Sequence, residues 1–211
     1  MIFENREQAG ELLSEKLKNY KDNKNAIVIG LARGGIITAE AIAKNLNLSL
    51  DIIAPRKISS PVDPELAIGA ITQDGQAVLD KNLINSMGIA QSYIDKEIEK
   101  EKLEAQRRLK VYRAGKESLN LKNKIVILVD DGIATGSTIK AAIKYVKSQN
   151  AKNIIIAVPV APEDIIKELK KEVNNVVCIN ISVNFLAISM YYKKFEQTTD
   201  EEVKNIMNKS N

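Results

Sequence analysis

The loop that begins at residue 130 holds the side chains best suited to chemistry. Asp130 and Asp131 are adjacent carboxylates, and the glycines Gly132 and Gly136 precede a run of hydroxyl side chains. Glycines let a backbone approach a ligand closely, and amides at the start of a helix bind an anion without a cationic side chain. Carboxylates would repel that anion, so they must serve sugar hydroxyls or a coordinated metal. A phosphorylated sugar meets both demands.

Two other interpretations of this loop are open on the residues alone. It could be an ordinary strand-to-helix turn in which Asp and Thr cap the helix, or part of an unrelated phosphosugar- or nucleotide-binding α/β protein. It is not a Walker loop, because no Gly-Lys-Ser/Thr occurs. It is not a dinucleotide-binding fingerprint either, because Gly-x-Gly-x-x-Gly is missing.

Two absences narrow the chemistry further. The chain has no histidine and one cysteine, Cys178, which excludes an intramolecular disulfide, His/Cys zinc sites, Ser-His-Asp triads and Cys-His dyads. Acid–base work therefore falls to carboxylates, Lys, Tyr or groups of the substrate. Cys178 lies in an apolar run at residues 176–181, which predicts a buried structural thiol.

Charge and hydropathy indicate an ordinary globular chain of 211 residues. The 31 Lys and Arg against 27 Asp and Glu give a net charge of +4, too small a surplus to favour a nucleic-acid partner. No apolar run is long enough to span a membrane, and the start of the chain lacks the order of a secretory signal. We expect a cytoplasmic protein with no membrane partner.

Strand and helix patterns alternate along most of the chain. Helices are predicted at residues 6–20, 36–46, 90–111 and 138–149, with another opening at 162; strands at 26–31, 50–54, 124–129, 153–158 and 176–181; and a hairpin at 66–72 and 76–79. This alternation predicts one α/β domain with a parallel sheet of about five strands. Such sheets bind ligands at the carboxyl ends of their strands.

Residues 126–138 read Val-Ile-Leu-Val-Asp-Asp-Gly-Ile-Ala-Thr-Gly-Ser-Thr. This run resembles the phosphoribosyl pyrophosphate (PRPP) motif of the type I phosphoribosyltransferases, and the resemblance extends from about residue 3 to residue 203. It implies a single phosphoribosyltransferase domain over residues 1–211, with a parallel β-sheet flanked by helices, a flexible loop insertion at about 59–115 and a C-terminal hood at about 182–211. Members of the family commonly form dimers, so a homodimer is expected.

The resemblance also implies roles for the motif. Asp130 and Asp131 would hold the ribose hydroxyls, and Mg²⁺ would bridge hydroxyl and pyrophosphate oxygens without direct protein ligands. The residues expected to wrap the 5-phosphate are Gly132, Ile133, Ala134, Thr135, Gly136, Ser137 and Thr138.

A second loop lies where the family binds pyrophosphate. It is formed by Ala32, Arg33, Gly34 and Gly35. The two glycines permit unusual backbone angles, and Arg33 can bind phosphate oxygens bidentately, as can Arg56 beside Lys57 after the next strand. A simple turn is the alternative interpretation of the two glycines. With the acidic pair, Arg33 completes the expected catalytic set.

In the family, the insertion closes over the reacting groups and excludes water. Arginines of the 90–111 region and beyond, Arg107, Arg108 and Arg113, could then reach the pyrophosphate. In the alternative interpretation they pair with Glu101 and Glu104 on a solvated helix. Glu65 is a candidate carboxylate of the closing loop.

The implied reaction is displacement of pyrophosphate from ribose C1 by a ring nitrogen of a base, in nucleotide salvage. The motif has Ala134 where oxopurine enzymes carry an acidic residue, and residues 160–162 lack the lysine that contacts a 6-oxo group. Guanine and hypoxanthine are therefore disfavoured. Phe185 matches a position from which related enzymes stack on a purine, although core filling explains it equally.

A regulatory protein that senses PRPP without catalysis is the alternative function. Ala134 and the missing lysine favour it. Turnover with any base would exclude the sensor and support the enzyme.

Overall fold

The body of the molecule is built on a parallel sheet. Its strands are β1 (Ala26–Leu31), β2 (Ser49–Ile53), β6 (Ile125–Val129), β7 (Asn153–Pro162) and β8 (Asn175–Ser182). In the computed structural model, which describes residues 1–64 and 66–210, these five strands follow the order β2-β1-β6-β7-β8. Each neighbouring pair is parallel. The predicted α/β fold is confirmed.

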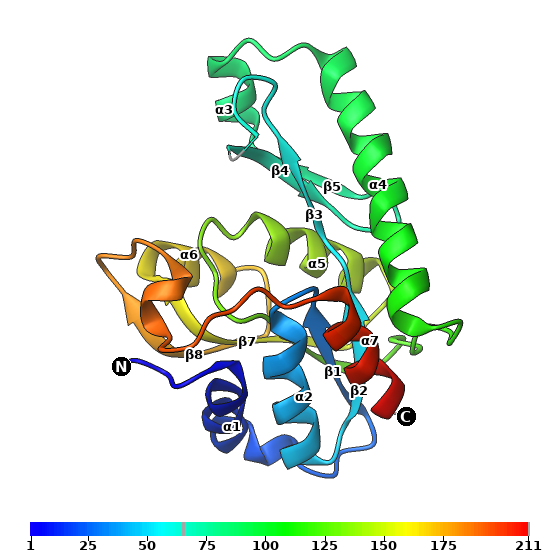
Figure 1. Cartoon of the computed structure of the whole chain (residues 1–211), viewed down its shortest axis with the longest axis vertical. Coiled ribbons are helices and arrows are strands. Elements are labelled where there is room, and N and C mark those ends of the chain that lie inside the picture. Colours follow the sequence, from blue (N-terminus) through cyan, green and yellow to red (C-terminus); the bar gives the residue numbers. More distant parts are fainter. Residues whose placement is uncertain (65, 211) are drawn as a thin grey trace.

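Helices cover both faces of this sheet (Figure 1). They are α1 (Arg6–Lys16), α2 (Gly35–Leu46), α5 (Ser137–Ser148), α6 (Glu163–Leu169) and α7 (Asp200–Lys209). Leu13, Ile36 and Val203 join α1, α2 and α7 to one buried cluster, whereas Ile139 and Leu169 join α5 and α6 to another. Because both faces are covered, every residue of β1 is buried, which explains its continuous apolar run.

A lobe stands away from the body between β2 and β6 (Figure 1). It contains β3 (Arg56–Ser59), β4 (Ala67–Ile71), β5 (Ala77–Leu79), α3 (Lys81–Ser86) and α4 (Gln91–Arg113). The three strands form an antiparallel sheet in the order β3-β4-β5. Ile58, Ile68, Ile71, Ile84 and Ile94 form the lobe's own apolar core.

The lobe confirms one prediction and corrects another. The expected hairpin is present as β4 and β5. The sequence interpretation ended a strand at residues 55–57 and continued as a loop, which is wrong for Arg56–Ser59, because these residues form β3 against β4. Its partner strand lies beyond an intervening loop, so no local pattern reveals the pairing. Glu65, the candidate closing-loop carboxylate, lies outside the described residues.

The two ends of the chain differ in detail from expectation. The predicted helix at 6–20 ends as an α-helix at Lys16 and continues as a short 3₁₀ turn, η1 (Lys18–Tyr20). In the predicted hood, a second 3₁₀ turn, η2 (Ile188–Tyr191), follows β8. The chain then crosses the body, drawn from orange to red in Figure 1, and ends in α7, which packs against α2 and α4. The sequence analysis did not anticipate α7.

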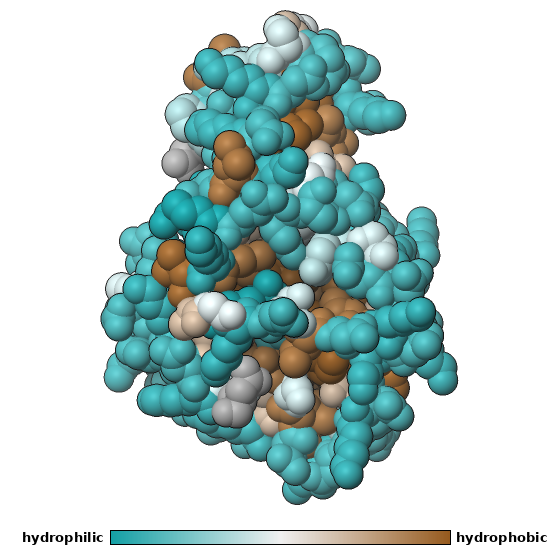
Figure 2. Space-filling view, turned by 90° about the vertical axis from the view of Figure 1, so that its right-hand side faces the viewer, coloured by the Kyte–Doolittle hydropathy of each residue, from teal (hydrophilic) through white to brown (hydrophobic). Residues whose placement is uncertain are grey.

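Hydrophilic residues cover most of the face that carries α4 and α7 (Figure 2). No helix within residues 1–64 and 66–210 is long and apolar enough to cross a membrane.

Candidate active site

Two loops that leave neighbouring strands meet at one edge of the sheet. β1 pairs with β6 in a register that sets Gly30 beside Val129. The loops at residues 32–34 and 130–136 therefore begin side by side, at the carboxyl ends of their strands. Parallel sheets bind ligands at this edge. The structure thus brings together the two loops that the sequence analysis singled out.

Gly34 and Gly35 allow the first loop to touch the acidic pair. A Cβ atom on Gly35 would lie 2.8 Å from the Cα atom of Asp130, and one on Gly34 would overlap Oδ2 of Asp131. Gly34 has φ −60° and ψ −39°, angles that any residue adopts. The expectation of unusual backbone angles is therefore wrong at Gly34. The glycine is needed for space, which a simple turn would not require.

The acidic pair is in an unfavourable electrostatic environment. Burial and the neighbouring Asp131 carboxylate raise the pKa of Asp130 well above its usual range. Burial also raises the pKa of Asp131, although the Arg6 guanidinium opposes that rise. Oδ1 of Asp130 accepts a hydrogen bond of 2.9 Å from the backbone N–H of Asp131. A ligand that supplies hydroxyl donors or positive charge would relieve the repulsion between the two carboxylates.

Residues 132–138 lead into the start of α5. Gly136 has φ 79°, in the left-handed region that favours glycine, and no side chain of the described residues caps this helix. The Asp/Thr capping interpretation is therefore wrong. The Ile133 N–H donates to the carbonyl of Val160 at 2.9 Å, which anchors the loop on β7. The hydroxyls of Thr135 and Ser137 lie 3.2 Å apart beside the helix N-terminus. Phosphate groups bind in such surroundings.

Arg6 is a site residue that the sequence analysis missed. Its Nε donates to Oδ2 of Asp131 at 2.6 Å, and only 9% of the residue is exposed. The residue was assigned to a scaffold helix because its partner lies 125 positions away. One signal was available: Arg6 opens α1, where the positive end of the helix dipole disfavours a cation. A basic residue in that position needs another partner.

Arg33 lies next to a cavity at the same edge. The cavity has a volume of about 310 Å³ and is lined by Arg6, Arg33, Gly34 and residues 195–198. The peptide bond between Ala32 and Arg33 is cis. Nη1 of Arg33 lies 3.6 Å from Oδ1 of Asp200, and the buried Thr198 hydroxyl has no partner among the described residues. The cavity wall therefore offers a guanidinium to a polar ligand, while the Thr198 hydroxyl is buried behind it.

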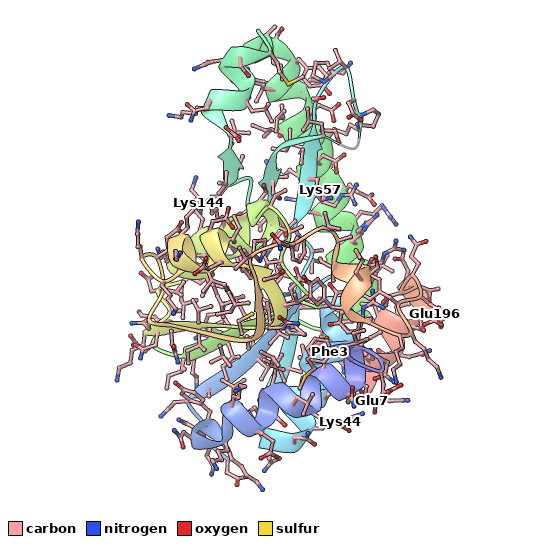
Figure 3. The ribbon with its side chains drawn as sticks, turned by 90° about the vertical axis from the view of Figure 1, so that its left-hand side faces the viewer. Phe3, Glu7, Lys44, Lys57, Lys144 and Glu196 are labelled. Atoms are coloured by element: carbon pink, nitrogen blue, oxygen red, sulfur yellow. The ribbon has the colours of Figure 1, made fainter. Side chains whose placement is uncertain are left out.

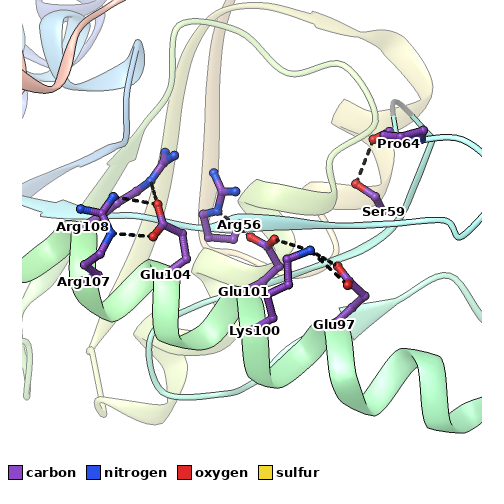
Figure 4. Close-up of polar contacts among 9 residues, drawn as sticks. All are labelled: Arg56, Ser59, Pro64, Glu97, Lys100, Glu101, Glu104, Arg107 and Arg108. Carbon is purple, nitrogen blue, oxygen red and sulfur yellow. Dashed lines mark hydrogen bonds and ion pairs between the residues drawn. The ribbon is translucent and has the colours of Figure 1, made fainter.

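The remaining predicted pyrophosphate ligands lie on β3. Nε of Arg56 donates to Oε2 of Glu101 on α4 at 2.7 Å, so this arginine is paired with a carboxylate (Figure 4). Lys57 is exposed at the base of the lobe (Figure 3).

The arginines of α4 are also paired. Arg107 and Arg108 both donate to Glu104, at helical spacing, which agrees with the solvated-helix interpretation (Figure 4). Arg113 instead binds Asp51 of β2, at 3.0 Å. The alternative that these arginines reach a bound pyrophosphate stays a prediction.

Two further predicted residues lie near the hood. The half-buried Phe185 stacks on Tyr191, with ring centroids 5.7 Å apart and planes 13° apart. Base stacking by this ring stays a prediction. Cys178 is half-buried and packs against the core beside α5 and α6, and burial raises the pKa of its thiol to about 11. A thiol of this kind is structural rather than reactive.

The acidic pair is not a metal cage by itself. Among residues 1–64 and 66–210, no group of three or more His, Cys, Asp or Glu side chains could hold a metal ion. Mg²⁺ commonly keeps several waters and takes much of its coordination from substrate phosphates. The two adjacent carboxylates are oxygen donors of the kind Mg²⁺ prefers, and a Mg²⁺ ion shared between them and a phosphorylated ligand stays a prediction.

Two curated proteins are similar to this chain in sequence. Two proteins from Mycobacterium tuberculosis, of strains CDC 1551 / Oshkosh and H37Rv, bear provisional phosphoribosyl transferase names and are each 37% identical to this chain over 202 residues. The match covers 96% of this chain and 45% of each relative. The chain therefore spans about half the length of the curated relatives it matches.

Solved structures agree. The crystal structure of TT1426 from Thermus thermophilus is 33% identical, covers 100% of this chain and 99% of that one, and superposes with a TM-score of 0.82. The AQ2163 protein from Aquifex aeolicus shares the fold at a TM-score of 0.52 and 12% identity, over 84% of this chain and 74% of that one. Residues 1–194 match the phosphoribosyl transferase domain, and the chain belongs to that family.

Proposed function

We propose that this chain transfers a phosphoribosyl group from PRPP to a nitrogenous base and releases pyrophosphate. The contact between the Gly34–Gly35 loop and the Asp130–Asp131 pair is the observation that carries this proposal. It sets a loop suited to pyrophosphate directly beside carboxylates suited to a ribose diol. Family membership supports a transferase of the glycosyl class.

The ligand would lie across both loops. Its 5-phosphate would accept hydrogen bonds from residues 132–138 at the start of α5, and its ribose hydroxyls would donate to Asp130 and Asp131. Its pyrophosphate would lie against residues 32–35, where Arg33 offers a guanidinium to the cavity. Arg56 would contribute from β3 after releasing Glu101.

Charge stabilisation is the main task of such a site. Displacement at ribose C1 leaves positive charge on the sugar ring and negative charge on the departing pyrophosphate. The carboxylates lie beside the first charge, and Arg33 lies beside the second. A bound Mg²⁺ would neutralise pyrophosphate oxygens. No protein nucleophile is required, which suits a chain without histidine and with an inert thiol.

We propose a purine-type acceptor, in cytoplasmic nucleotide salvage. Phe185 supports this choice, because it is an aromatic ring on the hood with one face stacked on Tyr191. Ala134 and the lysine-free residues 160–162 argue against a 6-oxopurine. A non-catalytic PRPP sensor is the second candidate, favoured by the same Ala134.

A double substitution tests the proposal. Asp130→Asn with Asp131→Asn keeps the shape of both side chains and removes their charge. We expect calorimetry with PRPP and Mg²⁺ to show tight binding by the wild type and none by the variant. The variant should still unfold cooperatively, at a lower melting temperature, because Arg6 loses the carboxylate of its buried ion pair. Binding by the double variant would exclude this assignment of the site. Pyrophosphate release with a panel of bases then separates the enzyme from the sensor.

A further inference from the structure

We propose that Arg6 is a positioning residue that holds the Asp131 carboxylate in place for the ribose hydroxyls. The proposal rests on the proposed function, because it requires Asp131 to bind the sugar. It extends the site to the first helix of the chain, which contributes no residue to either loop.

Three contacts fix the Arg6 guanidinium. Nε donates to Oδ2 of Asp131 at 2.6 Å, and Nη1 donates to the carbonyl of Glu196 at 2.8 Å. The guanidinium carbon lies 3.9 Å from the centroid of the Phe195 ring. A planar fork can make these contacts at once, whereas the point charge of a lysine cannot. The geometry thus uses properties specific to arginine.

Backbone pairing between the two ends of the chain places Arg6 there. The Phe3 N–H donates to the carbonyl of Tyr191, and the Lys193 N–H donates to the carbonyl of Phe3, each at 2.8 Å. Figure 3 shows Phe3 and Glu196 on one side of the body. The Tyr192 hydroxyl also donates to the backbone carbonyl of Asp131 at 2.6 Å. Asp131 is therefore held through its side chain by one end of the chain and through its backbone by the other.

A purely structural role explains this arrangement poorly. Replacing a buried ion pair by apolar residues of similar size is often neutral or stabilising, so such a pair is weak evidence of a contribution to stability. Residues that orient a ligand-binding group, in contrast, are needed for its geometry. Behind metal ligands, the loss of such a partner commonly costs about 10–100-fold in metal affinity or activity, and we take the same range for Arg6. Arg6 contacts Asp131, which lies in the loop that meets Gly34. This position is the one expected of a residue that orients a ligand-binding group.

A direct role in pyrophosphate binding is the competing explanation. Arg6 lines the same cavity as Arg33, so its guanidinium could itself contact phosphate oxygens. The two explanations differ in the ligands they affect. Ribose 5-phosphate has the ribose diol and no pyrophosphate, whereas inorganic pyrophosphate has no sugar.

The test is calorimetric titration of the full chain with PRPP, ribose 5-phosphate and inorganic pyrophosphate, each with Mg²⁺. We expect Arg6→Gln to weaken the binding of PRPP and of ribose 5-phosphate by the same factor, about 10–100-fold. The affinity for pyrophosphate should not change. Arg6→Lys should recover part of the loss. Tyr192→Phe keeps the ring and removes the hydroxyl, and it should weaken the binding of PRPP and of ribose 5-phosphate. It provides a second variant if Arg6→Gln does not fold.

Lys193→Gln is the matched control. It removes an exposed ion pair with Glu4 in the same paired terminal segments and leaves Asp131 untouched. We expect wild-type affinity for all three ligands, since exposed ion pairs contribute little. The proposal would be overturned if Arg6→Gln lost affinity for pyrophosphate, whether alone or together with the other two ligands. It would also be overturned if Arg6→Gln kept wild-type affinity for all three ligands. If the wild type bound neither PRPP nor ribose 5-phosphate, the proposed function itself would fail.

Discussion

The Gly34→Ala substitution tests whether the two loops must touch. Alanine adopts the backbone angles of Gly34 freely, and in an open position the change would stabilise the fold by about 0.4–1 kcal/mol by restricting the unfolded chain. Here the added methyl group would overlap Oδ2 of Asp131 and lie 2.9 Å from Nε of Arg6. Any destabilisation must therefore come from this overlap and not from the backbone.

The expected magnitude follows from these opposing terms. Overpacking costs about 1–3 kcal/mol, so after the gain from alanine the free energy of unfolding should fall by about 1–2 kcal/mol. For a chain of this size that corresponds to a fall in melting temperature of about 2–8 °C. The Asp131 carboxylate must also move by roughly an ångström, a displacement that can cost about 100-fold in rate. We expect a comparable loss of affinity for PRPP.

Thermal melting and calorimetric titration with PRPP measure both quantities, and Gly88→Ala is the control. Gly88 has φ 60°, and a Cβ atom added there would meet no atom of the described residues within 4 Å. Alanine at this position therefore costs about 1–2 kcal/mol through its left-handed backbone alone. Its affinity for PRPP should equal that of the wild type. Wild-type affinity in Gly34→Ala would refute the argument that the loops must meet.

Three further predictions concern individual side chains. Hydrogen bonds from two arginines of α4 lower the pKa of Glu104 from 4.5 to about 2. The ionised carboxylate therefore stabilises the fold fully above pH 4.5, and this stabilisation is lost as the pH falls toward 2. Urea unfolding across this range should show a fall in the free energy of unfolding that is absent from Glu104→Gln. The raised pKa of Cys178, about 11, predicts slow alkylation by iodoacetamide at pH 8 in the folded protein and fast alkylation in urea, which mass spectrometry measures. Tyr112 donates to Oδ1 of Asp200 at 2.7 Å, so Tyr112→Phe should lower the free energy of unfolding by about 1–2 kcal/mol in urea titrations.

Strands of the body could be predicted because both of their faces are buried. The runs that became β1 and β6 are apolar throughout, a pattern that only a sheet covered on both sides requires. The acidic pair and the Gly34–Gly35 loop were found for a related reason. Each follows such a strand directly, so identifying the strand also locates the loop at the ligand-binding edge.

Contacts between distant segments could not be predicted in the same way. β3 is a short strand whose partner follows a loop, and its apolar contribution to the lobe core rests on Ile58. Arg6 reaches Asp131 only because the first and last segments of the chain pair through their backbones. Backbone pairing of this kind leaves no periodicity in either segment. The predicted partners of the arginines were partly wrong for the same reason, since Glu101 pairs with Arg56 of a different element.

The ion pairs of the two arginines proposed to bind pyrophosphate have a consequence for ligand binding. Arg33 lies near Asp200 of α7, and Arg56 pairs with Glu101 of α4. The Arg33–Asp200 pair is long and exposed on both sides, so it is weak, whereas bidentate contacts to phosphate are strong. Arg56 is more than a quarter exposed, but its partner Glu101 is buried. A pyrophosphate that binds as proposed would replace two carboxylates, one on the C-terminal helix and one on the lobe. Ribose 5-phosphate would leave both pairs intact, so only a ligand with pyrophosphate would release the Asp200 and Glu101 carboxylates from these arginines.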